Sequence, residues 1–363
     1  MPHRDFTAAL RGLAFGGALG AALLSNAPAA LAQEKTEFRL AWSIYVGWMP
    51  WGYIEDSGIM DRWAERYGID VEIVQINDYV ESINQYAAGA FDGVSATNMD
   101  TLSIPSGGGV DTTALIVGDY SNGNDAVILK GEGDLTSLAG KKVNLVELSV
   151  SHYLLARGLD SVGLSERDLG GVVNTSDADM IAAYATDDVE AVVTWNPLVS
   201  AILETPGANK LFDSSDIPGE IIDLLVVNTE TLAANPAFGK AVTGAWYEAM
   251  ALMSSDTEEG RAARTAMGEA SGTDLPGYDA QLASTAMFYD PAEAVAFTQS
   301  AELPRTMVEV AEFLFDKGIL GEGAPSADFV GVAYPDGSVT GDPGNVKFRF
   351  DTTYMQMAAD GAL

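Results

Sequence analysis

Carboxylates and aromatic rings gather in six short stretches of this 363-residue sequence, residues 42–52, 77–80, 97–101, 118–125, 147–153 and 194–197. The acidic residues among them are Asp78, Asp100, Asp119, Asp125 and Glu147. The aromatic ones are Trp42, Tyr45, Trp48, Trp51, Tyr79, Tyr120, Tyr153 and Trp195. A carboxylate accepts two parallel hydrogen bonds from a guanidinium, and an indole face attracts the same flat cation. The stretches hold no Lys or Arg, the side chains that an anionic ligand needs. They therefore predict a site for a small planar nitrogen-rich solute, guanidinium first, with urea as the alternative.

The composition excludes several other kinds of site. The chain has no Cys and two His, and His3 lies in an N-terminal segment that we expect to be removed. A zinc site of His and Cys ligands is therefore excluded, and a Ser-His-Asp triad would depend on His152 alone. The formal net charge of −33 repels nucleic acid and anionic lipid. We expect no cofactor, no metal and no enzymatic activity.

Residues 1–32 have the pattern of an export signal. Arg4 and Arg11 give a positive start, residues 12–24 form a short apolar run, and Ala30-Leu31-Ala32 offers a small-x-small cleavage site. The apolar run is shorter than the ~20 residues that a membrane helix needs. The sequence therefore predicts a cleaved signal and a periplasmic, monomeric mature protein that begins near Gln33.

The rest of the chain alternates predicted strands and helices, which indicates α/β lobes with mainly parallel sheets. Strands are predicted at 38–42, 71–76, 93–96, 113–117, 126–129, 143–146, 191–194 and 224–227. Helices are predicted near 59–67, 78–88, 152–163, 181–184, 241–253, 291–298 and 304–315, and the tail from Gly321 is expected to wrap the surface. We predict one lobe from 33–123 and 225–363, a second from 124–224, and a two-strand hinge between them. The six stretches follow strand ends, where open α/β sheets bind ligands.

These stretches also carry a family resemblance, in Trp42 to Trp51, Gln75 to Tyr79, Val146 to Tyr153 and Val193 to Pro197. From Phe38 onward the chain resembles the substrate-binding proteins of nitrate/sulfonate/taurine-type ABC importers. Within them it is similar to a branch encoded beside urea carboxylase, associated with urea and guanidine. The resemblance implies a type II periplasmic-binding fold whose lobes close over a solute and deliver it to a permease driven by a cytoplasmic ATPase. Two alternatives are an enzyme on the same fold, like those of thiamine-pyrimidine synthesis, and a receptor that presents its closed form to a sensor.

The predicted ligand contacts are polar, acidic or aromatic residues of the stretches, with Asp223 beside the hinge: Trp42, Ser43, Tyr45, Trp48, Asp78, Asn98, Asp100, Asp119, Glu147, Ser149, His152, Trp195, Asn196 and Asp223. Glu147 is the leading candidate for a charged contact.

Several of these residues have a structural alternative. Asp78 with Glu81 forms a capping-box pattern, and Asn98, Ser149 and Asn196 precede predicted helices that they could cap. A lone His such as His152 is commonly a hydrogen-bonded structural residue. Asp119 lies beside a Ser-Asn-Gly turn, which gives it a possible role in the turn instead.

Overall fold

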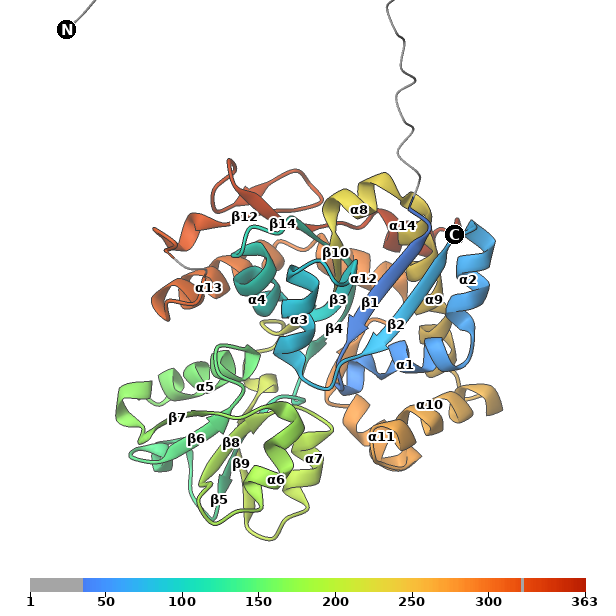
Figure 1. The fold of residues 1–363 in the computed structure, drawn as a ribbon. Helices are drawn as coiled ribbons and strands as arrows, with labels where there is room; N and C mark the ends of the chain where they lie inside the picture. Colours follow the sequence, from blue (N-terminus) through green and yellow to red (C-terminus); the bar gives the residue numbers. More distant parts are fainter. Residues whose placement is uncertain (1–34, 321–322) are drawn as a thin grey trace, which may run out of the picture. The chain divides into compact units, whose positions relative to one another are not determined.

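The computed structural model describes residues 35–320 and 323–363, which form one compact unit (Figure 1). The predicted export signal lies outside the described residues. Within these two ranges, no helix has both the length and the apolar character required to cross a bilayer.

The larger sheet in the described ranges has nine strands, in the order β13-β12-β14-β4-β10-β3-β1-β2, with β11 paired to the end of β4. Their bounds are β1 (Glu37–Trp42), β2 (Asp70–Gln75), β3 (Gly93–Thr97), β4 (Thr112–Ser121), β10 (Ile222–Asn228), β11 (Thr285–Met287), β12 (Gly331–Ala333), β13 (Val339–Thr340) and β14 (Val346–Phe350). The smaller sheet has the order β7-β6-β8-β5-β9. Its strands are β5 (Ala126–Lys130), β6 (Lys142–Leu145), β7 (Gly171–Asn174), β8 (Ala191–Thr194) and β9 (Ala208–Asp213).

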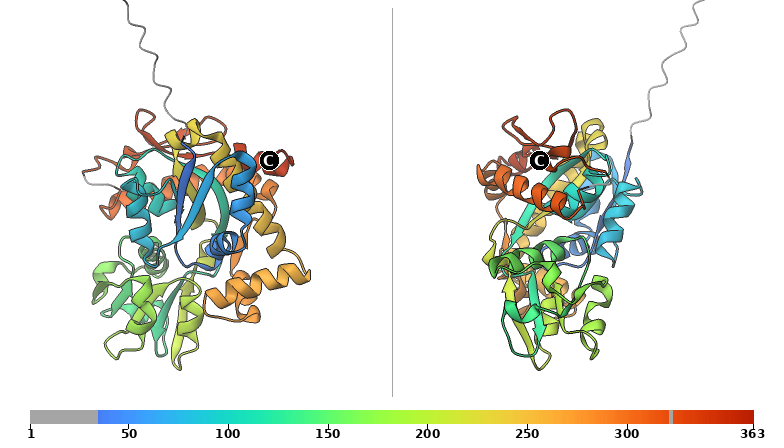
Figure 2. Two further views of the ribbon diagram at one scale, coloured as in Figure 1. Left: turned by 45° about the vertical axis from the view of Figure 1, so that its right-hand side comes forward. Right: turned by 90° about the vertical axis from the view of Figure 1, so that its left-hand side faces the viewer.

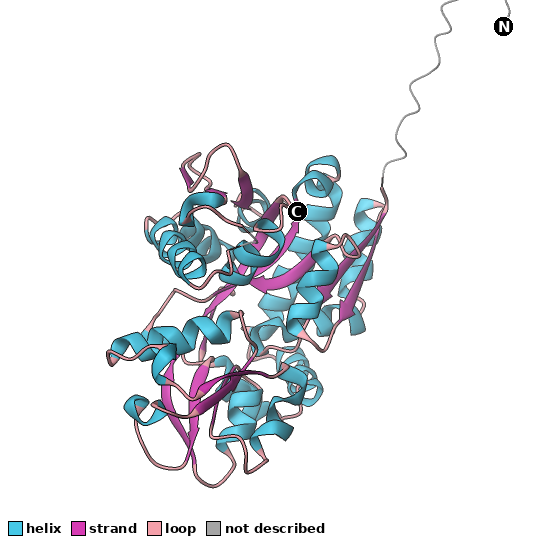
Figure 3. Ribbon diagram, turned by 60° about the vertical axis from the view of Figure 1, so that its left-hand side comes forward, coloured by secondary structure: helices cyan, strands magenta, loops and turns pink. Residues whose placement is uncertain are grey.

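Helices flank the strands of both sheets (Figure 3). The helices before residue 122, where the chain first leaves the larger sheet for the smaller one, are α1 (Met49–Asp56), α2 (Ile59–Tyr67), α3 (Tyr79–Ala87) and α4 (Asn98–Thr101). The smaller sheet carries α5 (Val150–Ser161), α6 (Met180–Tyr184) and α7 (Leu198–Leu203). The remaining helices are α8 (Thr229–Ala234), α9 (Pro236–Met253), α10 (Glu258–Ala270), α11 (Leu275–Leu282), α12 (Pro291–Thr298), α13 (Glu302–Asp316) and α14 (Thr353–Ala359).

The predicted α/β class with two sheets is confirmed, and we use "first lobe" for the sheet of β1 with its helices and "second lobe" for the sheet of β6 with α5–α7. Both views of Figure 2 show the second lobe as a continuous green block of the chain. The residue limits of the two lobes given above stay a prediction.

The expectation of mainly parallel pairing needs a correction. β1 is parallel to β2 and β3, but β10 is antiparallel to β3 and β4, and β5 is antiparallel to β8 and β9. The physical reason is the connection, because β5 and β10 are each entered by a crossing from the other sheet and not by a right-handed β-helix-β unit.

The C-terminal tail also differs from its prediction. Part of it enters the first sheet, where β14 pairs in parallel with β4. The sequence pattern that predicts this strand is the alternation of apolar and charged residues from Val346 to Phe350. In the structure Phe348 and Phe350 are buried, whereas Lys347 and Arg349 are only half-buried.

The chain crosses between the sheets twice, through residues 122–125 and 214–221, and hydrogen bonds join the two crossings. Ser214 Oγ lies 2.6 Å from Ser121 Oγ and accepts from the Gly123 N–H at 2.7 Å. The Ser214 N–H donates to the Asp125 carbonyl at 3.0 Å. These bonds make the two crossings one connected hinge.

The centre of the first sheet has no room for a side chain at Gly93. A Cβ there would lie 2.7 Å from Leu40 Cδ2 and 2.8 Å from the Val226 carbonyl oxygen. We predict that Gly93→Ala lowers the free energy of unfolding by about 1–3 kcal/mol, because the core must shift to accept the methyl group. Thermal unfolding is the measurement, since urea and guanidinium are the expected ligands.

The control for this prediction is Gly344→Ala, where the nearest atom to the added Cβ is a side-chain oxygen of the exposed Asp342, 3.1 Å away. It should leave the melting temperature nearly unchanged. Equal melting temperatures for Gly93→Ala and the parent protein would contradict the packing argument.

Candidate functional site

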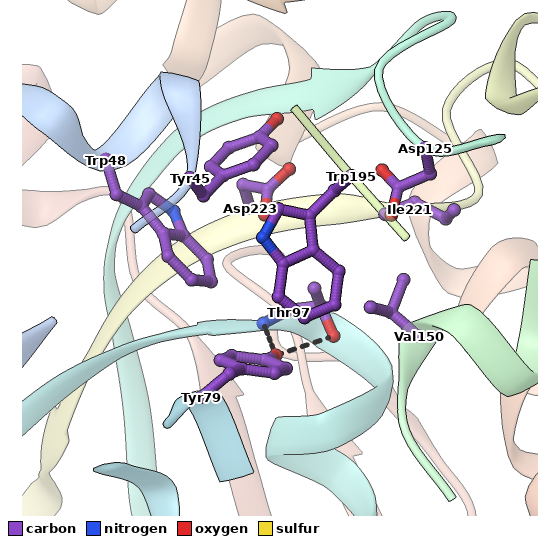
Figure 4. Close-up of a pocket in the computed structure, with 9 residues that line it drawn as sticks. All are labelled: Tyr45, Trp48, Tyr79, Thr97, Asp125, Val150, Trp195, Ile221 and Asp223. Atoms are coloured by element: carbon purple, nitrogen blue, oxygen red, sulfur yellow. Dashed lines mark hydrogen bonds between the residues drawn. The ribbon is translucent and has the colours of Figure 1, made fainter. Parts of the chain in front are cut away.

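A small cavity lies where the ends of β1, β3 and β10 meet residues of the second lobe (Figure 4). It is lined by Tyr45, Trp48, Tyr79, Thr97, Asp125, Val150, Trp195, Ile221 and Asp223. Its empty space is at most about 240 Å³. The enclosed part of this space is only about 10 Å³, about what one water molecule needs, so a solute of a few heavy atoms enters only if the lining side chains move apart.

Four aromatic rings form the wall of the cavity. Tyr45 and Trp48 have ring centroids 5.0 Å apart, Trp48 and Tyr79 5.6 Å, and Tyr79 and Trp195 5.5 Å. Tyr45 and Trp48 lie in the turn that follows β1, Tyr79 is the first residue of α3, and Trp195 follows β8. The Trp195 indole N–H donates to the Ile44 carbonyl at 3.0 Å, which fixes this ring of the second lobe against the first.

Three buried carboxyl groups lie at the cavity or directly beside it. Asp119 on β4 and Asp223 on β10 are directly opposed in the antiparallel pairing, and Asp125 comes from the first crossing. Their exposed fractions are 0%, 3% and 3%. The Tyr45 hydroxyl donates to Asp119 Oδ1 at 2.8 Å, and Ser121 Oγ donates to Asp125 Oδ2 at 2.5 Å. The second oxygens of Asp119 and Asp223 have no partner within the described residues.

Burial raises the pKa of each of these three groups. It raises the pKa of Asp119 and of Asp125 to about 7. The pKa of Asp223 rises well above its ordinary value through burial and then through the charge of Asp119. Two like charges opposed on neighbouring strands repel, so the Asp119–Asp223 pair favours holding a proton when no cation is near.

No positive side chain compensates these carboxyl groups. Neither Lys nor Arg lines the cavity, and none of the ion pairs found in residues 35–320 and 323–363 includes Asp119, Asp125 or Asp223. No group of three or more side chains suited to a metal ion occurs in the same ranges. The site is therefore aromatic, acidic and short of positive charge.

The structure brings six of the fourteen predicted contacts to this site. Tyr45, Trp48, Trp195 and Asp223 line the cavity. Asp119 is bonded to the hydroxyl of the lining Tyr45, and Asp100 to that of Tyr79.

Four first-lobe residues among the predictions lie elsewhere. Trp42 lines a separate groove beside α1 and α10, and its ring leaves no room for a Cβ on Gly52. Asp78 caps α3 by accepting from the Glu81 N–H, which is the predicted structural alternative. Asn98 bonds the Glu220 carbonyl and the Ile222 N–H, and Thr97 caps α4 in its place. Ser43 is fully buried with its hydroxyl unpaired among the described residues, outside the lining set.

Four second-lobe predictions need the same correction. Glu147 is exposed in the turn after β6, so the leading charged candidate does not reach the cavity. Ser149 caps α5, and Asn196 Oδ1 accepts from the Ser200 N–H at the start of α7. His152 Nδ1 accepts from the Leu148 N–H, and its Nε2 lies 3.1 Å from the carboxylate of Glu166. The side chains of Ser149, Asn196 and His152 thus stabilise local backbone or a neighbouring side chain.

Five lining residues were absent from the predicted contacts: Tyr79, Thr97, Asp125, Val150 and Ile221. Four of them lie in the six stretches that follow strand ends, so position alone could have found them. Ile221 lies in the second crossing and had no sequence signal.

Comparison with known proteins supports a solute-binding fold. The family model described as NMT1/THI5 like matches residues 63–259, which is more than half of the chain. The chain belongs to the NMT1/THI5-like family. It is 26% identical over 200 residues to a Brucella abortus protein whose name describes a binding protein, covering 54% of this chain and 61% of that one. It is 32% identical over 125 residues to an Escherichia coli protein named for binding aliphatic sulfonates, covering 34% and 39%. The matches thus span about three fifths or less of these relatives.

Solved structures give the same fold at lower identity. The alkanesulfonate-binding protein of Xanthomonas axonopodis, bound to MOPS, superposes with a TM-score of 0.66 at 18% identity, over 80% of this chain and 96% of that one. The periplasmic nitrate-binding protein of Synechocystis superposes with a TM-score of 0.55 at 13% identity, over 91% and 99%. The chain therefore has the periplasmic-binding-protein fold, as predicted.

The buried carboxyl groups make stability depend on pH. Unfolding restores an ordinary aspartate pKa near 3.9, so the folded protein retains protons that the unfolded chain has lost. The contribution of these groups to stability is therefore complete below about pH 4 and is lost as pH rises to about 7, the pKa of Asp119 and Asp125. We predict that the melting temperature of the ligand-free protein falls between pH 5 and 7.

Asp125→Asn removes one of these titrations and should make the fall shallower. The control is Asp316→Asn, at an exposed position of α13, which should retain the parent slope. Parallel melting curves for the parent and Asp125→Asn across this pH range would contradict the assignment.

Proposed function

We propose that this protein is the extracytoplasmic solute-binding component of an ABC importer, that it captures guanidinium by closure of its two lobes, and that it delivers it to a permease. One observation carries the choice of ligand: Asp119, Asp125 and Asp223 are buried at or beside a cavity whose lining contains no Lys or Arg. A buried carboxylate without a cation costs several kcal/mol, so a cationic ligand is the species that stabilises the charged cluster most.

The aromatic wall supports the same ligand. Guanidinium is flat, and its faces are attracted by the faces of Trp and Tyr rings while its edges donate hydrogen bonds to carboxylates. Four rings and two lining carboxyl groups, Asp125 and Asp223, offer both kinds of contact within the cavity. A sulfonate or nitrate would meet carboxylates in the same place and would be repelled.

A single observation favours urea as the second candidate. The indole N–H of Trp48 is buried and has no acceptor within the described residues. Urea has a carbonyl oxygen that can accept from this donor, whereas guanidinium has donors only. A proton shared by Asp119 and Asp223 would also let this pair bind a neutral amide.

Two other functional classes fit less well. The nine lining residues include no His, Lys, Ser or Cys, so an enzyme here would have to use Asp, Thr or Tyr as its base or nucleophile, and the relatives reported above are named as binding proteins. A receptor that presents the closed form to a sensor would use the same site, and identification of the protein to which the closed form binds would distinguish it from an importer component.

Calorimetric titration of Asp223→Asn tests the ionic contact. Loss of a charged hydrogen bond should weaken guanidinium binding by about 30-fold or more. Urea binding should change by less than about fivefold, because urea carries no charge. Guanidinium should also release protons near pH 7, visible as a dependence of the binding enthalpy on the buffer's ionisation enthalpy, and urea should not.

The controls are Asp316→Asn and titrations with taurine and nitrate. The exposed substitution should leave both affinities unchanged. Tight binding of taurine or nitrate to the parent protein, with none of guanidinium or urea, would overturn the proposed ligand class.

Trp48→Phe separates the two candidate ligands. It retains a six-membered aromatic ring but removes the five-membered ring of the indole together with its N–H, so urea affinity should fall about five- to tenfold, mainly through one lost hydrogen bond. Guanidinium affinity should change less than about threefold, since the ring face remains. A larger loss for guanidinium than for urea would show that the indole N–H does not contact the ligand.

A further inference from the structure

Two helices begin at the boundary between the lobes, and each has a carboxylate of the opposite lobe at its first N–H group. The N–H of Tyr79, the first residue of α3 in the first lobe, donates to Asp177 Oδ1 of the second lobe at 3.3 Å. The N–H of Val150, the first residue of α5 in the second lobe, donates to Asp100 Oδ2 of the first lobe at 3.2 Å. We call Asp177 and Asp100 the reciprocal caps.

Both caps are additional to the ordinary helix caps. α3 already has Asp78 as its N-cap, and α5 has Ser149. The reciprocal caps therefore satisfy N–H groups that the local sequence leaves free, and they do so only while the lobes are together. Asp100 is fully buried and Asp177 is 5% exposed, so neither carboxylate exchanges these bonds for water in this conformation.

Tyr79 connects the two caps to the cavity. Its N–H contacts Asp177, its hydroxyl donates to Asp100 Oδ2 at 2.7 Å, and its ring lines the cavity. Asp100 Oδ2 also accepts from Thr97 Oγ1 at 3.0 Å, which holds it toward the start of α5. One continuous series of hydrogen bonds thus runs from the second lobe through Tyr79 and Asp100 back to the second lobe.

Two opposing electrostatic effects act on the reciprocal caps. Burial raises the pKa of Asp100 and of Asp177 to about 6, which costs free energy for the charged forms, whereas the helix N-termini attract these carboxylates and favour closure. The N-terminus of a helix carries about half a positive charge and attracts anions. With the lobes together, the helix ends that face the cleft meet carboxylates of the protein itself, in the place that an external anion would take. With the lobes apart, these ends and carboxylates are solvated and their attraction is weak.

We propose that Asp100 and Asp177 are positioning residues that act as built-in anions: they occupy the starts of α5 and α3 across the cleft, hold the lobes together before the ligand arrives, and deny these two helix N-termini to an anionic ligand. This inference rests on the proposed lobe-closing function. It does not depend on whether the ligand is guanidinium or urea.

The test measures lobe separation without ligand. The chain has no Cys, so Asn84→Cys on α3 and Ile181→Cys on α6, both exposed positions, can carry a pair of spin labels. Asp100→Ala and Asp177→Ala should each reduce the ratio of closed to open molecules about tenfold in the distance distribution. The matched control is Asp179→Ala, an exposed residue of the same turn as Asp177, which should leave the distribution unchanged.

Chemical rescue then separates a lost anion from general loss of structure. Formate is a small carboxylate, so at tens of millimolar it should restore the closed distance in the two Ala variants and have no effect on the parent protein. An unchanged distance distribution in either Ala variant, or an equal formate response in parent and variants, overturns the inference. Absence of guanidinium and urea binding to the parent, with these distances as expected, would instead overturn the proposed ligand alone.

Discussion

The constraint on which this site depends is the burial of negative charge at the point where the chain crosses twice between its sheets. Asp119, Asp125 and Asp223 lie on or beside those crossings, and hydrogen bonds from Tyr45 and Ser121 satisfy only part of their capacity. A protein selected only for stability would replace such a cluster by apolar residues, which pack at lower cost. The surrounding structure tolerates the cluster because the paired crossings and the strand register hold the carboxyl groups in fixed places.

The same placement couples ligand and conformation. Asp125 and Asp223 flank the hinge, whereas Trp195 and Val150 reach the cavity from the second lobe. Under the proposed function, a solute that neutralises the carboxyl groups would contact both lobes at once. The aromatic wall contributes in the closed arrangement in particular, since the Tyr79–Trp195 contact and the Trp195–Ile44 hydrogen bond each join the two lobes.

The sequence predicted the class of the fold and the kind of site better than the individual contacts. Because the six stretches follow predicted strand ends, they were expected to lie close together. Their residue types indicated an acidic and aromatic cavity, and such a cavity is found around Tyr45 and Asp223. Helix-capping patterns such as Asp78 with Glu81 were correct alternatives, because a cap is set by neighbours a few residues away. Glu147 failed because an acidic residue after a strand carries no information on which way a turn directs its side chain. The antiparallel direction of β10 was not predicted for a related reason. The direction in which the chain re-enters a sheet depends on the path of the crossing, which contacts between distant elements determine.

The limited volume of the cavity has a consequence for the range of compounds that the proposed function would admit. Only about 10 Å³ is enclosed beside the four aromatic side chains, so every added atom of a ligand must displace part of the lining. A guanidine with a long alkyl tail could place its head group against the carboxylates, but the tail would be wedged between the lobes. Such a compound would prop the protein open and act as a competitive blocker of uptake rather than as a substrate.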